Sequence, residues 1–166
     1  MPRIALLLAL AAILLLSGCG GPSYHFKPVP GRTGVVRQGY AFPPEEAPPV
    51  VHAAIAAGNR ISGLPYRRGG GHAREIDTAY DCSGAVSYVL REAGLMESSM
   101  PSKGFRRYGE AGEGEWISIY AKSGHVFLVV AGLRFDTGWT RAPEGPRWST
   151  LDRPAKGAVI RHPRGL

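Results

Sequence analysis

The clearest pattern of apolar and polar positions lies in residues 81–94. Apolar residues recur there at the spacing of one helix face: Ala85, Val86, Val89, Leu90 and Ala93. Asp81 is a residue type that favours the N-cap of a helix, and Gly94 stands where a glycine commonly ends one. The pattern therefore predicts a helix that begins at Cys82, buries one face and ends before Gly94.

Apolar runs elsewhere predict one more helix and a set of strands. Residues 48–58 have a helical apolar pattern, with two prolines near the start and Gly58 near the end. Residues 63–71 form a loop by their glycine content, and residues 101–114 show no clear element. Four later apolar runs predict strands: residues 115–121, 125–131, 133–138 and 157–160. Helices followed by strands indicate an α+β fold with an antiparallel sheet.

The N-terminal residues differ from the rest of the chain. Arg3 is followed by an apolar run that ends at Leu16; the run is too short for a comfortable membrane span and is typical of a secretory signal. The tetrapeptide Leu16-Ser17-Gly18-Cys19 resembles the bacterial lipobox, in which the signal is removed and the cysteine becomes the lipidated first residue. The alternative is an ordinary signal peptide that is cleaved nearby and leaves Cys19 free.

After the lipobox, proline and glycine are frequent and no apolar period is sustained. This composition predicts an extended, poorly ordered segment. The predicted organisation is a signal peptide in residues 1–18, a flexible tether in residues 19–47 and one folded domain in residues 48–166. We expect a lipid-anchored monomer of the cell envelope, on the outer membrane if the source is Gram-negative.

Charge narrows the choice of partners. The chain carries a formal net charge of +7, and basic surfaces attract nucleic acid, anionic lipid headgroups or acidic polymers. An exported lipoprotein would encounter anionic lipid headgroups and acidic polymers, but not nucleic acid. The chain also lacks the interleaved aromatic and basic residues of single-stranded nucleic-acid binders, so no nucleic-acid partner is expected. No cluster of histidine, cysteine or acidic residues has metal-site spacing, so we expect neither metal nor cofactor.

Cys82 is the first candidate for chemistry. The unpaired N–H groups and the dipole of a helix N-terminus favour the thiolate, which is the nucleophilic form of cysteine. If Cys19 carries lipid, Cys82 has no disulfide partner in the chain, and an unpaired cysteine in an exported protein is a candidate reactive thiol. The alternative is a small packing residue at the start of a helix.

His125 is the second candidate, because it begins a strand that is expected to be buried on both faces. If Ala131-Gly132 forms a two-residue hairpin turn, Asp136 falls opposite Phe127, on the same face as His125. A hydrogen bond between the imidazole and the carboxylate is then within reach. Cysteine, histidine and a polar orienting residue, in that order along the chain, are the arrangement of papain-like hydrolases. The alternatives are ordinary strand-end roles for both residues.

Three segments resemble the NlpC family of bacterial cell-wall cysteine peptidases over residues 48–140. They are Pro65-Tyr66 with Gly69-Gly70, then Tyr80-Asp81-Cys82-Ser83-Gly84-Ala85-Val86, and then Gly124-His125-Val126. The resemblance implies a papain-like α+β fold and hydrolysis of amide bonds in peptidoglycan stem peptides, often between D-glutamate and a diamino acid. The tail after Gly145 has no counterpart in the family.

The resemblance also implies roles for single residues. Cys82 would be the nucleophile, His125 the base, and Asp136 the third member, where many relatives carry histidine. The Tyr66 hydroxyl would point into the site. Asp81 and Ser83 would hold the free amino end of a stem peptide, with helix N-cap and first-turn hydroxyl as their alternative roles.

Two other functions remain open at this point. One is a cell-wall-binding lipoprotein that keeps the fold without cutting. The other is an acyl or amide transferase that uses the same Cys–His chemistry. His162 is the one other histidine near the end of the predicted sheet that could take the third role in place of Asp136.

Overall fold

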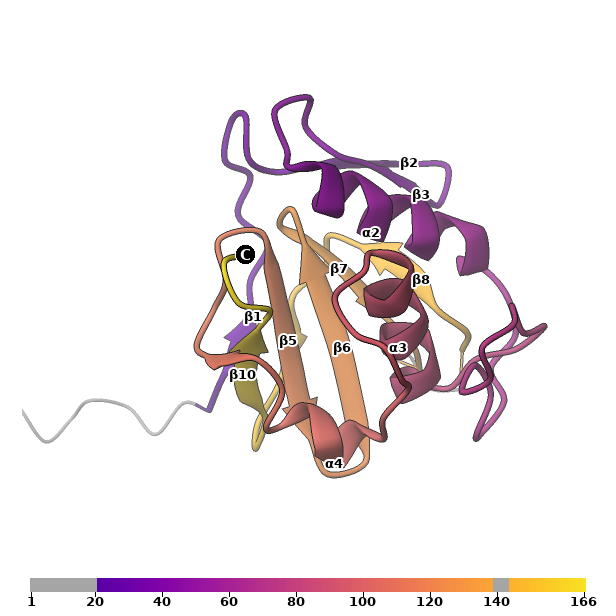
Figure 1. Ribbon diagram of the computed structural model, residues 1–166. Coiled ribbons are helices and arrows are strands. Elements are labelled where there is room, and N and C mark those ends of the chain that lie inside the picture. Colours follow the sequence, from indigo (N-terminus) through magenta and orange to yellow (C-terminus); the bar gives the residue numbers. More distant parts are fainter. Residues whose placement is uncertain (1–20, 139–143) are drawn as a thin grey trace, which may run out of the picture.

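A computed structural model describes residues 21–138 and 144–166, which form an α+β fold (Figure 1). The predicted signal peptide and Cys19 lie outside the described residues. Three described helices lie beside an antiparallel sheet with the order β4-β10-β5-β6-β7-β8. The helices are α2 (Pro49–Ile61), α3 (Cys82–Glu92) and α4 (Ser102–Phe105). The strands of this sheet are β4 (Glu110–Ala111), β5 (Ile117–Lys122), β6 (His125–Val130), β7 (Leu133–Asp136), β8 (Arg147–Ser149) and β10 (Val159–His162).

The two faces of the sheet are buried in different ways. Side chains alternate between the two faces along a strand, so Val126, Leu128 and Val130 of β6 point to the same face. On this face they pack in the main core with α2 and α3. On the other face, Phe127 stacks on Tyr120 with ring centroids 4.7 Å apart. A smaller cluster with Tyr24 and Ala155 covers this pair. His125 is the first residue of β6 and shares the face of Phe127, so it lies at the end of the strand on the side of the smaller cluster.

The predicted helix at Cys82 is confirmed. α3 runs from Cys82 to Glu92, and Gly94 follows it with a φ of 71°. The first predicted helix is also confirmed: α2 begins at Pro49 and continues three residues past Gly58 to Ile61. Gly58 is there for packing: a Cβ on it would lie 2.4 Å from the indole of Trp148.

The prediction of a flexible tether is wrong for residues 21–47, because these residues belong to the folded domain. Strand β1 (Ser23–Tyr24) pairs with β9 (Arg153–Pro154), and β2 (Val35–Arg37) pairs with β3 (Tyr40–Phe42). The side chain of Asn59 hydrogen-bonds both backbone groups of Ala41. These elements are two or three residues long and bury single side chains against distant segments. Such a pattern has no local period that a sequence could reveal.

The C-terminal tail completes the sheet. It supplies β8 and β10 to this sheet, with β10 between β4 and β5, and it supplies β9 to the two-stranded sheet with β1. The segment 101–114, in which no element was predicted, contains the short α4 and β4. Within the part of the chain that the structure describes, no helix is both long enough and apolar enough to cross a membrane.

The packing of Tyr24 yields a stability prediction. Tyr24 is 3% exposed, and its hydroxyl donates a 2.7 Å hydrogen bond to the carbonyl of Gly132. Tyr24→Ala should lower the free energy of unfolding in urea by about 3–5 kcal/mol, the usual cost of emptying an aromatic site. Tyr24→Phe should cost about 1 kcal/mol for the hydrogen bond alone. Tyr40→Ala, at a position that is 51% exposed, is the control and should cost less than about 1 kcal/mol. Equal effects at Tyr24 and Tyr40 would show that residues 21–47 are a tether after all.

Candidate active site

The N-terminus of α3 leaves Cys82 accessible within a buried helix. Residues Ser83 to Leu90 are buried, whereas Cys82 is only partly buried. Asp81 caps the helix: its Oδ1 accepts hydrogen bonds from the Gly84 amide at 2.7 Å and from the Ser83 hydroxyl at 3.0 Å. The cap fixes the first turn and sets the thiol at the positive end of the helix dipole. This agrees with the predicted position of Cys82.

A glycine loop holds Asp81 from the other side. The Gly69 amide donates to Asp81 Oδ2 at 2.9 Å, and the Asp81 amide donates to the Gly70 carbonyl at 3.2 Å. The loop approaches the helix so closely that a Cβ on Gly84 would lie 1.9 Å from the Gly70 oxygen. Glycine at position 84 therefore permits the contact between the loop and α3.

The surroundings of Asp81 include a histidine that the sequence analysis did not select. The Nε2 of His72 lies 3.2 Å from Asp81 Oδ1 and 3.3 Å from the Ser83 hydroxyl. Burial, the largest influence, raises the pKa of Asp81, but the hydrogen bonds from Gly84, Gly69 and Ser83 outweigh it, and the net pKa is lowered. Both carboxylate oxygens are thus engaged with the protein, and Ser83 is turned toward Asp81. This arrangement fits their alternative, structural roles.

The hairpin between β6 and β7 brings Asp136 to His125, as predicted. Val130 pairs with Leu133 across a two-residue turn in which Ala131 and Gly132 both have positive φ angles. The Nε2 of His125 lies 2.8 Å from Oδ1 of Asp136. Asp136 is 3% exposed, so the bond is shielded from water.

Two arginines stabilise the negative charge of Asp136. The Nη1 of Arg134 lies 3.7 Å from Asp136 Oδ2, and the Nε of Arg153 lies 3.4 Å from it. Arg134 is fully buried beside Asp136 on β7, while Arg153 comes from β9 and also lies 3.4 Å from His125 Nε2. Sequence reasoning missed both residues. An arginine within an apolar strand and one in a short edge ribbon carry no sequence signal of a shared partner.

The His125 ring is held in its charged form. Burial, the largest influence, lowers its pKa; hydrogen bonds to Asp136 and Cys82 and the charges of both residues act the other way and raise the pKa to about 9. The interaction with Cys82 connects the N-terminus of α3 with the histidine on β6. At neutral pH the protonated imidazole therefore faces the Cys82 side chain.

Tyr66 lies in the electrostatic field of the same site. It forms a parallel bridge with Tyr80, the residue that precedes Asp81. Burial raises the pKa of Tyr66, and the negative charges of Cys82 and Asp81 raise it further. The hydroxyl therefore remains protonated, which suits a hydrogen-bond donor to a developing oxyanion.

His162, the alternative third residue, makes its contacts at the β4–β10 edge of the sheet and not with His125. The Nδ1 of His162 lies 3.1 Å from the Gly112 carbonyl, and its Nε2 lies 3.5 Å from Glu110. Both contacts belong to the β4–β10 edge of the sheet. Over residues 21–138 and 144–166, no group of three or more histidine, cysteine or acidic side chains is arranged to hold a metal ion.

Comparisons with known proteins identified no relative of this chain. No family model matches the chain, and no curated protein or solved structure matches it.

The raised pKa of His125 can be measured without any assumption about activity. NMR titration of the His125 ring should give a midpoint of about pH 9 in the unaltered chain, because the folded state favours the protonated ring. Asp136→Asn removes a charge that raises this pKa, so the midpoint should move toward the ordinary histidine value near 6.5. Cys82→Ala should lower the midpoint as well. An unchanged midpoint in both variants would contradict the coupling of the three residues.

Proposed function

We propose that this protein is a cysteine peptidase that cleaves amide bonds in peptidoglycan stem peptides. The observation that carries the proposal is a partly accessible Cys82 at a helix N-terminus, hydrogen-bonded to His125 on β6. The hydrogen bond to buried Asp136 completes the set. The papain-like architecture and the choice of substrate rest on the resemblance to the NlpC family in segments 65–70, 80–86 and 124–126.

In the proposed mechanism, the Cys82 thiolate attacks the amide carbonyl while His125 is protonated. The backbone N–H of Cys82 at the helix N-terminus and the Tyr66 hydroxyl donate to the oxyanion. His125 then gives its proton to the leaving amine, and a thioester remains on Cys82. Water hydrolyses the thioester with His125 as base. Asp136 orients the ring and stabilises its cation throughout.

The proposed substrate class follows from compartment and resemblance together. A lipobox and a secretory signal send the chain to the cell envelope, where peptidoglycan is the abundant peptide polymer. Recognition of a free amino end by Asp81 stays a prediction of the resemblance. Since both of its oxygens already accept hydrogen bonds from the protein, an incoming amine would share an engaged carboxylate.

Cys82→Ala should abolish hydrolysis while the fold persists. Removal of a triad nucleophile typically costs several orders of magnitude in rate, and a partly exposed cysteine contributes little packing. Purified muropeptides are incubated with the chain, and the products are followed by mass spectrometry. Ser87→Ala, a buried change later in the same helix, is the matched control and should retain turnover.

The product masses also separate the alternatives. Cleavage fragments that gain one water support hydrolysis. A fragment joined to an added amine would make the protein a transferase, and intact muropeptides with the unaltered chain would leave only a binding role.

Cys19 is proposed as the lipid attachment site. Cells that express the chain and take up alkyne-tagged palmitate should label the unaltered protein and the Cys82→Ala variant equally. Cys19→Ser should lose the label, because no other cysteine precedes the domain. Label that persists in Cys19→Ser would exclude the lipobox assignment.

A further inference from the structure

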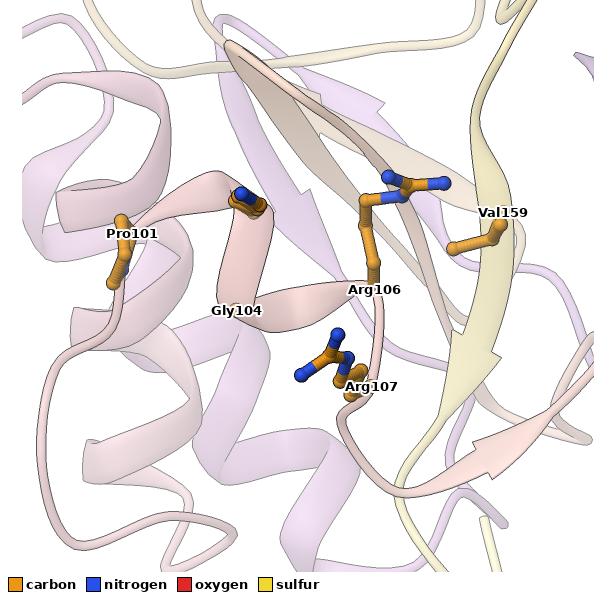
Figure 2. A pocket seen from close by; sticks show the side chains of 6 residues that line it. Pro101, Gly104, Arg106, Arg107 and Val159 are labelled. Carbon is orange, nitrogen blue, oxygen red and sulfur yellow. The ribbon is translucent and has the colours of Figure 1, made fainter.

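A basic pocket lies beside α4 and is lined by none of the proposed catalytic residues. It has a volume of about 490 Å³ and is lined by Pro101, Lys103, Gly104, Arg106, Arg107 and Val159. Figure 2 shows the Arg106 side chain extending toward Val159. Proline, glycine and valine supply apolar walls, while the three cations stand at the surface. The pocket therefore combines positive charge with apolar walls.

The cations of this pocket are exposed and not committed to the protein's own acids. Among the described residues, no carboxylate forms an ion pair with Lys103, Arg106 or Arg107, whereas Arg32 and Arg60 pair with glutamates. Charges that the fold leaves exposed and unneutralised are available to an anionic partner.

The start of the described chain lies close to this pocket. Pro22 accepts a 2.9 Å hydrogen bond from the Ala155 amide, and a Cβ on Gly21 would lie 3.3 Å from Lys156 Cα. Val159, a wall of the pocket, follows three residues after Lys156. In Figure 1, β1, β10 and α4 lie toward the lower part of the molecule, away from β2 and β3 at the top.

Chain length then limits how far a lipid anchor can be. Cys19 precedes Gly21 by two residues, which span at most about 7 Å, and Lys156 precedes Val159 by at most about 11 Å. A lipid on Cys19 would hold this side of the domain against the bilayer. The flexible spacer that the sequence analysis expected is not available to separate them.

We propose that the pocket, together with Lys156, docks on an anionic phospholipid surface. Guanidinium groups of Arg106 and Arg107 match phosphate oxygens, and the apolar walls suit the glycerol and first methylene groups below a headgroup. A purely ionic polymer has no apolar groups to contact these walls, whereas a phospholipid does. Cations near an anionic bilayer also add to acyl-chain anchoring as a second attachment.

Docking would orient the proposed catalytic site. The Ser102 hydroxyl, at the start of α4, accepts a 3.2 Å hydrogen bond from the amide of Gly124, the residue before His125. A bilayer contact through α4 therefore fixes the direction in which the β5–β6 turn faces. The inference rests on the proposed anchor at Cys19 but not on the proposed peptidase activity.

The test uses the chain from residue 19 with Cys19→Ser, which has no lipid and contains every described residue. It should float with vesicles of phosphatidylcholine mixed with phosphatidylglycerol, and not with phosphatidylcholine alone. Arg106→Gln combined with Arg107→Gln should weaken binding about thirty-fold, which corresponds to roughly 2 kcal/mol for two interfacial cations. The matched control combines Arg37→Gln with Arg74→Gln, two exposed arginines elsewhere, and should bind as the parent does.

Equal losses in the two double variants, or no preference for phosphatidylglycerol, would overturn the proposal. Binding to purified cell-wall polymer through Arg106 and Arg107, without vesicle binding, would overturn it too. Hydrolysis of soluble muropeptides is measured in parallel and should be the same in the Arg106/Arg107 double variant. Vesicle binding by a chain that fails to hydrolyse would reject the proposed function alone and support the docking surface.

Discussion

Asp136 is a carboxylate with 3% exposure, and much of the structure is arranged around its charge. An isolated buried charge is costly, so its partners must arrive from several elements. His125 comes from β6, Arg134 from the same strand as Asp136, and Arg153 from β9. The Thr137 amide donates to the same oxygen that His125 approaches. Loss of one partner from such a buried set typically costs about 3–5 kcal/mol, so position and charge are fixed together.

The N-terminal residues take part in this arrangement. The guanidinium of Arg134 lies 5.9 Å from the ring centroid of Tyr24, within the range of a cation–π interaction. Tyr24 is on β1, which pairs with β9 and so supports Arg153. The segment closest to the proposed lipid anchor is therefore packed behind the carboxylate that holds His125. The candidate site and strand β1, which look independent in the sequence, share one buried layer.

Local signals in the sequence predicted the parts of the site that depend on neighbours in the chain. The Asp81 cap and the apolar period of α3 are set within one helix, and the two-residue turn fixed the register that carries Asp136 to His125. His72 and Arg153 were missed because they reach the site through a glycine loop and an edge ribbon. The folded role of residues 21–47 was missed for the same reason, since pairing between β1 and β9 joins opposite ends of the chain and leaves no period to detect.

Two carboxylates, Asp81 and Asp136, have different structural roles at the candidate site. Asp81 is bound by groups within about a dozen residues of itself and shapes the position of Cys82, with a lowered pKa that keeps it an acceptor. Asp136 is bound by side chains from its own strand, from β6 and from β9, and it helps to hold the charge on His125. The thiol and the imidazole therefore belong to separately built halves, one helical and one in the sheet. The thiol and the imidazole meet because α3 packs against β6 through the main core.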